Sequence, residues 1–150
     1  MEISILVLPL LASIIAGFFG KLIGDRNSEI VTSLLVTISA ILSTIVFYNV
    51  IINQYQENII IATWINSGSL EVNWSMKIDT LSAVMLVVVT SVSSLVHIYS
   101  IGYMSHDPHK PRFMAYLSLF TFAMLMLVTS DNFIQLFFGW EGVGLCSYFL

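Results

Sequence analysis

The sequence predicts an all-α polytopic membrane protein with about five transmembrane helices and a surface β-hairpin near residues 59–78. Hydrophobic residues make up 57% of the 150 residues and charged residues only 9%, with a mean hydropathy of +0.92. A soluble domain carries about 25% charged residues, so this chain could not cover its surface with polar groups. Apolar stretches near the roughly 20 residues that a spanning helix needs recur along the chain, and one further stretch alternates between apolar and polar residues.

Polar residues separate the predicted helices and supply their caps. Ser28 is a candidate N-cap of the second helix, Asp79 of the third, and Asp131 with Asn132 of the fifth. Residues 105–111 contain two prolines, which remove backbone donors and clash with the preceding turn, so this segment cannot stay helical. The predicted helices cover residues 3–22, 30–52, 80–104, 113–130 and 133–150. The fifth is still apolar at residue 150, so we expect a chain truncated within helix five.

The stretch before the third helix is typical of a strand pair. Its apolar residues Leu70, Val72, Trp74, Met76 and Ile78 alternate with Glu71, Asn73, Ser75 and Lys77. A period of two is the pattern of a strand with one wet face. Residues 59–65 are a plausible partner strand, and the Asn, Ser and Gly of residues 66–69 suit a hairpin turn. The two tryptophans, Trp64 and Trp74, suit the aromatic belt at a membrane surface.

The charges limit the classes of partner and the orientation. Five basic and nine acidic residues give a net charge of −4, and no basic patch is interleaved with aromatic residues, so nucleic acid is not an expected partner. The single cysteine, Cys146, excludes an internal disulfide and a multi-cysteine metal site. Four of the basic residues, Lys21, Arg26, Lys110 and Arg112, lie in or directly beside the two loops that follow the first and third helices. By the positive-inside rule, these loops face the inner side, and the N-terminus and the hairpin face the outer side.

Glu141 is the residue that most suggests a function. It lies about nine residues into the fifth predicted helix, about 14 Å deep and near the middle of a roughly 30 Å hydrocarbon core. An acidic side chain there costs about 2.5–3.5 kcal/mol, so it should face protein or water. Burial favours the neutral acid, and an approaching cation or water would release the proton. We therefore predict a proton-relay residue; the alternative is a protonated acid that only hydrogen-bonds between helices.

His97 is a weaker candidate for proton relay, and three residues near Glu141 could contribute to its surroundings. His97 lies about 10 Å from the inner end of its helix and titrates near neutral pH, so it could relay protons, although a plain interhelical hydrogen bond fits equally. Tyr148, one heptad after Glu141, shares its face and could donate a hydrogen bond to it. Gly142 and Gly144 leave space beside the carboxyl, or alternatively allow close helix packing. No phosphate-binding loop, dinucleotide fingerprint or paired nucleophile is present, so no cofactor-binding or metal site is predicted.

Several motifs resemble one family of membrane proteins. They are Asp79-Thr80-Leu81-Ser82, the stretch from His97 to Met104, Arg112-Phe113, and Gly139-Trp140-Glu141-Gly142-Val143-Gly144-Leu145-Cys146-Ser147-Tyr148. Together they resemble subunit L (chain 5) of the proton-pumping NADH–quinone oxidoreductase, respiratory complex I. The glycine-rich stretch around Glu141 is the most specific of them, and the resemblance runs over essentially the whole chain.

The resemblance implies a fold and a role. Such subunits have an antiporter-like fold of more than a dozen helices in the distal membrane arm, and residues 1–150 would be the N-terminal part of that transmembrane domain. They translocate protons, and Glu141 matches a glutamate of their central proton path. NADH, FMN, iron–sulfur clusters and quinone are expected in other subunits of the complex. The implied partners are the lipid bilayer, other membrane-arm subunits and protons, in a bacterial or mitochondrial inner membrane.

Two other interpretations remain open at this point. The large subunit of a multisubunit Na⁺/H⁺ antiporter shares ancestry and the same buried glutamate, although the glycine-rich flank of Glu141 is more similar to the complex I version. The second is a structural membrane subunit that transports nothing, in which Glu141 only forms hydrogen bonds between neighbouring helices.

Overall fold

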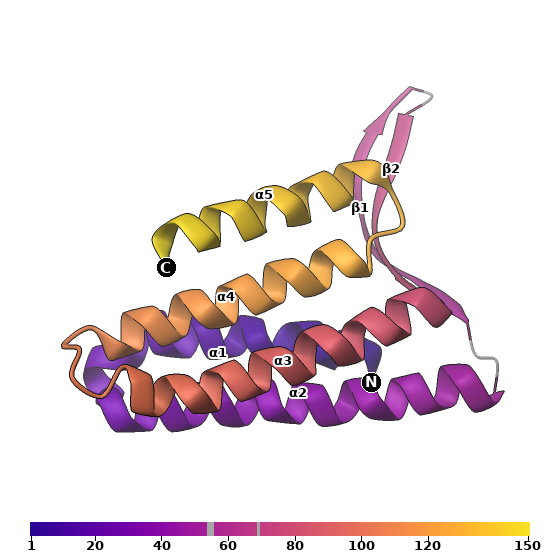
Figure 1. Ribbon diagram of the computed structural model, residues 1–150. Coiled ribbons are helices and arrows are strands. Elements are labelled where there is room, and N and C mark those ends of the chain that lie inside the picture. The colour runs from indigo at the N-terminus through magenta and orange to yellow at the C-terminus, as the bar shows by residue number, and fades with distance from the viewer. Residues whose placement is uncertain (54–55, 69) are drawn as a thin grey trace.

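The structure is a bundle of membrane-length helices with a β-hairpin at one end (Figure 1). It is a computed structural model that describes residues 1–53, 56–68 and 70–150, apart from the side chain of Leu70. The elements are α1 (Glu2–Ile23), α2 (Asp25–Asn53), β1 (Glu57–Ser67), β2 (Leu70–Ile78), α3 (Thr80–Tyr103), α4 (Lys110–Val128) and α5 (Phe133–Phe149). Four of the described helices, α1 to α4, are long and apolar enough to cross a membrane. The predicted all-α polytopic fold with one hairpin is confirmed.

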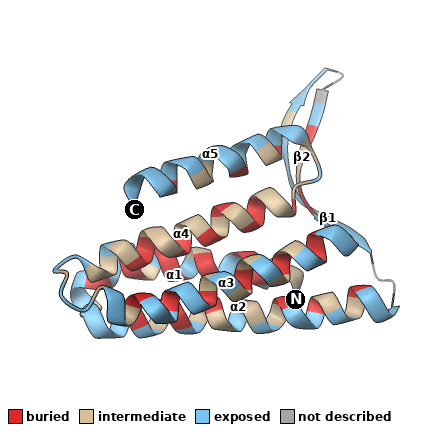
Figure 2. Cartoon of the chain, in the orientation of Figure 1, coloured by how far each residue is buried: buried red, intermediate tan, exposed pale blue. Residues whose placement is uncertain are grey.

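The helices pack in an order that places α4 near the centre. The α1 helix packs against α2 and α4, α2 also packs against α3, and α4 packs against α3 and α5. Figure 2 shows buried residues on the facing sides of α1 to α4, whereas most of α5 and of the hairpin is exposed. One side of α5 is covered by α4, and the hairpin contacts its first turns; beyond those turns, most of its other side is exposed.

Two helices begin earlier than predicted. The α2 helix begins at Asp25 rather than residue 30, and α4 at Lys110 rather than residue 113. The predicted N-cap Ser28 is wrong, since this serine lies inside α2 and is fully buried. The break before α2 needs only Gly24, whose φ of +88° lies in the left-handed region that favours glycine. Polar and charged residues fit in these first turns because the ends of membrane helices reach water.

The caps of α3 and α5 follow the sequence more closely. Asp79 is the N-cap of α3, as predicted, and its carboxylate accepts a backbone hydrogen bond. Asn132 is the N-cap of α5, and its Oδ1 accepts from the Gln135 N–H at 2.8 Å. Asp131 is not a cap: its Oδ2 accepts a 2.9 Å hydrogen bond from the amide of Asn58 on β1. The neighbouring asparagine occupies the cap position, which leaves Asp131 free for this contact.

The hairpin is antiparallel and carries part of the hydrophobic core. Val72, Met76 and Ile78 are buried as the alternation predicts, and Met76 and Ile78 join the core cluster at this end of the bundle. The alternation fails at Ser75, which was predicted to be exposed and is 2% exposed. The reason is tertiary: α5 lies against this part of β2, and its Gln135 side chain binds the backbone of Ser75.

The hairpin is fastened to the start of α5. The Gln135 Oε1 accepts from the Ser75 N–H at 3.0 Å, and the Gln135 Nε2 donates to the Ser75 carbonyl at 2.7 Å. The amide of Asn132 donates to the Asn73 carbonyl at 2.8 Å. Trp64 and Trp74 form edge-to-face contacts with Phe138 of α5, as well as with one another. The hairpin therefore fixes α5 relative to the rest of the bundle.

Candidate functional site: His97 and Glu141

His97 lies in the interior of the bundle. It is on α3, six residues before Tyr103 and so about 9 Å from the end of that helix, and its side chain is fully buried. The Nδ1 atom lies 2.8 Å from the Ser93 carbonyl, one turn earlier on α3, and Nε2 lies 3.0 Å from the Ser118 hydroxyl on α4. Both ring nitrogens thus have partners, one of them on the neighbouring helix.

The partners of His97 suit both of its protonation states. A carbonyl only accepts, so Nδ1 carries a proton and donates to Ser93. The Ser118 hydroxyl also lies 2.9 Å from the Met114 carbonyl. In the neutral ring, Ser118 donates its proton to Nε2; in the cation, Nε2–H donates to Ser118, whose hydroxyl turns to Met114. A single hydroxyl rotation therefore satisfies either state without moving a helix.

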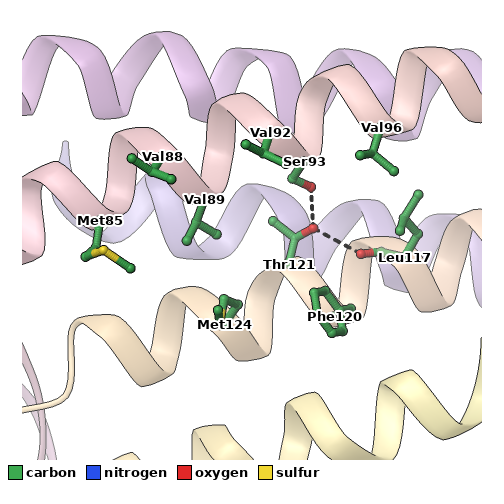
Figure 3. Close-up of a pocket in the computed structure, with 10 residues that line it drawn as sticks. All are labelled: Met85, Val88, Val89, Val92, Ser93, Val96, Leu117, Phe120, Thr121 and Met124. Atoms are coloured by element: carbon green, nitrogen blue, oxygen red, sulfur yellow. Dashed lines mark hydrogen bonds between the residues drawn. The ribbon is translucent and has the colours of Figure 1, made fainter.

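Hydroxyl groups extend this polar region between α3 and α4. The Ser93 hydroxyl is hydrogen-bonded to that of Thr121, which in turn donates to the Leu117 carbonyl (Figure 3). Both side chains border a cavity of about 300 Å³ whose other walls are aliphatic side chains, methionine and phenylalanine (Figure 3). A further buried hydroxyl pair, Ser43 and Thr90 at 2.7 Å, joins α2 to α3. Such pairs satisfy polar groups between membrane helices.

Glu141 lies on the open side of α5. It is eight residues after Phe133, which places it about 12 Å along the helix. The side chain is exposed in this chain, so the described residues do not provide the predicted burial. No ion pair or hydrogen bond joins Glu141 to another described residue, and the predicted contact with Tyr148 is not formed. Tyr148 itself is 84% exposed.

The glycines around Glu141 have different surroundings. A Cβ on Gly142 would lie 3.1 Å from the Ala123 Cβ of α4, so this glycine serves close helix packing. Gly144 has open space around it. The tightest position is Gly139, where a Cβ would lie 2.8 Å from the backbone N and Cα of Leu127. The glycine-rich flank therefore brings α5 against α4 and leaves the carboxyl on the opposite side.

The structure does not bring the two predicted site residues together. His97 is on α3 and Glu141 on α5, and α4 packs between these helices (Figure 1). Sequence reasoning also missed a buried acid: Glu29, 4% exposed, lies 3.9 Å from the Lys110 ammonium. Glu29 lies near the start of α2, and nothing in the local sequence pattern indicates a partner on α4.

The chain is similar to known proteins along its whole length. A family described as NADH-ubiquinone oxidoreductase (complex I), chain 5 N-terminus, matches residues 64–114. NADH-ubiquinone oxidoreductase chain 5 of Arabidopsis thaliana is 57% identical over 150 residues, which are 100% of this chain and 22% of that protein. The protein of the same name from Phytophthora infestans is 55% identical over 148 residues, 99% of this chain and 22% of the relative.

This chain belongs to the NADH-ubiquinone oxidoreductase chain 5 family. It spans about a fifth of the length of the curated relatives that it matches. The family and the four membrane-length helices make this chain 5 homologue a multi-pass protein of an inner membrane. The resemblance drawn from the sequence is confirmed.

Proposed function

We propose that the chain is part of a proton-translocating membrane-arm subunit of NADH:ubiquinone oxidoreductase, in which Glu141 takes up and releases protons. The observation that carries the proposal is the placement of this carboxyl. The other acidic residues lie in loops, in the hairpin or within the first five residues of a helix, whereas Glu141 lies about 12 Å into an apolar one. A charge at that depth costs about 2.5–3.5 kcal/mol unless it is paired or hydrated.

The exposed side of α5 supports a proton-exchange role for Glu141 that depends on which groups approach its carboxyl. Since no described residue pairs with Glu141, its charge state is set by whatever covers that side in the full-length subunit. A cation or water there favours the carboxylate, and its withdrawal favours the neutral acid. His97 is proposed as a second relay, because its partners Ser93 and Ser118 suit both the neutral ring and the cation. NADH, FMN, iron–sulfur clusters and quinone are proposed to bind in other subunits, which are the chain's partners together with lipid.

The test is proton pumping by the assembled complex. Glu141→Gln in the full-length subunit is expected to lower the number of protons pumped per NADH oxidised, with the complex still assembled, because glutamine cannot exchange a proton. His97→Gln should lower pumping less, since it removes one relay but keeps hydrogen bonding. Glu71→Gln, at an exposed position of the hairpin, is the matched control and should leave pumping unchanged.

The outcome separates the remaining interpretations. Normal pumping by well-assembled Glu141→Gln enzyme would favour a structural role for this residue. The comparisons do not favour the antiporter alternative; loss of sodium tolerance with NADH oxidation intact, on deletion of the subunit, would revive it.

A further inference from the structure

A groove runs between α1 and α4, from the end of the bundle that carries the α1–α2 and α3–α4 loops toward its middle. Its outer part is a cavity of about 460 Å³ with Lys21, Asp25, His109 and Arg112 in its walls. Its inner part is a second cavity of about 310 Å³. The two cavities share the lining residues Gly17, Ala115 and Tyr116, so they lie next to one another between α1 and α4 and together make up the groove.

The outer part carries positive charge at the depth of a membrane surface. Lys21 lies in the last turn of α1 and Arg112 in the first turn of α4. Neither forms an ion pair with a described residue. The Arg112 guanidinium is held over the Tyr116 ring, 5.5 Å from its centroid, and Nε–H donates to the Tyr116 hydroxyl at 3.3 Å. Two unpaired cations on facing helices thus border one cavity, with the carboxylate of Asp25 beside them.

The inner part is mostly apolar, with Ser13 and Tyr116 as the polar residues of its lining. Leu10, Ile14, Phe18 and Leu119 line it, and Gly17 contributes no side chain. A Cβ at Gly17 would lie 3.6 Å from the Ala115 Cβ, an ordinary contact, so an alanine would fit but a large side chain would fill the groove.

The length of the groove matches one leaflet of a bilayer. From Lys21 to Leu10 is eleven residues along α1, about 16 Å of rise. Half of a roughly 30 Å hydrocarbon core is about 15 Å. The groove therefore begins with cations at the surface and continues as a mostly apolar channel to about the middle of the membrane.

We propose that this groove is a binding site for an anionic phospholipid, with its phosphate between Lys21 and Arg112 and one acyl chain along the inner cavity. The phosphate diester matches the two unpaired cations, and the acyl chain matches the apolar walls. A free phosphate ion would satisfy the outer cavity but leave the inner one without an occupant. The charge and the length of the groove thus select a lipid over a small anion.

The experiment uses the assembled complex with the full-length subunit, reconstituted in phosphatidylcholine vesicles that contain a small fraction of phosphatidylglycerol. That phosphatidylglycerol carries a photoreactive diazirine on its acyl chain. After irradiation, peptide mass spectrometry is expected to find adducts on residues 10–18 of α1 and on Leu119. Each basic residue near an anionic lipid strengthens binding about fivefold, so Lys21→Gln with Arg112→Gln should reduce these adducts about 25-fold.

Matched controls separate a specific site from general attraction. Arg26→Gln, at a basic residue of the same end that does not line the groove, should leave the adducts unchanged. Gly17→Phe should abolish the adducts by filling the groove, whereas Gly17→Ala should retain them. Wild-type complex without adducts in the groove, or a double variant labelled as strongly as wild type, would overturn the proposal. Loss of the adducts on adding inorganic phosphate would also overturn it, since a free anion would then be the ligand.

Discussion

The contact between Gln135 and β2 gives a quantitative prediction. Gln135 is 1% exposed and holds both the N–H and the carbonyl of Ser75, at 3.0 and 2.7 Å. The hairpin has two strands, so this side chain satisfies backbone groups on an edge that no third described strand covers. Gln135→Leu keeps the apolar volume but leaves the two buried backbone groups of Ser75 without partners.

The expected cost follows from those two groups. An unsatisfied buried donor or acceptor costs about 1–3 kcal/mol. Water that enters along the strand edge recovers part of it, so we expect about 2 kcal/mol in total. Since about 1.4 kcal/mol corresponds to a factor of ten, amide exchange at Ser75 should become about 30-fold faster.

Hydrogen–deuterium exchange of the assembled complex, followed on peptides that contain residues 70–78, measures this change. Asn58→Ala is the control, because it removes an exposed hydrogen bond to Asp131, and Asn58 pairs with Lys77 rather than with Ser75. Unchanged exchange at Ser75 in Gln135→Leu would refute the view that this glutamine fastens the hairpin to α5.

Two further changes test the packing and capping of the helices. Gly139→Ala would place a Cβ 2.8 Å from the Leu127 backbone and push α5 away from α4, so it should lower the thermal unfolding midpoint, at a cost of about 1–3 kcal/mol. Gly144→Ala, in open space, should not lower the midpoint. Equal unfolding midpoints for the two variants would contradict the close approach of Gly139 to Leu127. The Ser82 N–H holds the pKa of Asp79 below its usual value, so the stability it contributes is present at neutral pH and is lost as pH falls through that depressed value. Asp79→Ala should lower the free energy of unfolding by about 1 kcal/mol at neutral pH. Asp79→Asn should keep most of the capping energy but lose its pH dependence. Thermal melts across the acidic pH range check both variants, and the same pH dependence of the unfolding midpoint in wild type and Asp79→Asn would contradict the role of the Asp79 carboxylate.

The number and the kind of elements could be predicted from the sequence because each depends on a local pattern. Apolar stretches of membrane length predicted the helices, and the alternation in residues 70–78 predicted β2. Helix starts were less predictable, since Asp25 and Lys110 are polar and hydropathy does not distinguish a first turn from a loop. The burial of Ser75 depends on its contact with Gln135 of α5, which no pattern within β2 reveals.

The two candidate site residues were chosen from the sequence alone, whereas their surroundings needed the structure. Glu141 and His97 stand out as ionisable groups in apolar helices, and His97 is buried between polar partners. The exposure of Glu141 depends on what covers the far side of α5, which local sequence does not encode. Gln135 and Glu29 acquire their contacts only through distant elements, β2 and α4, so their roles needed the structure.

Redox-triggered infrared difference spectroscopy of the assembled complex tests most directly whether Glu141 changes its protonation state. A protonated carboxyl has a carbonyl stretch that a carboxylate lacks, so turnover should produce a difference band in wild type that is missing in Glu141→Gln and retained in Glu71→Gln. Identical difference spectra for wild type and Glu141→Gln, with both complexes active, would contradict the account.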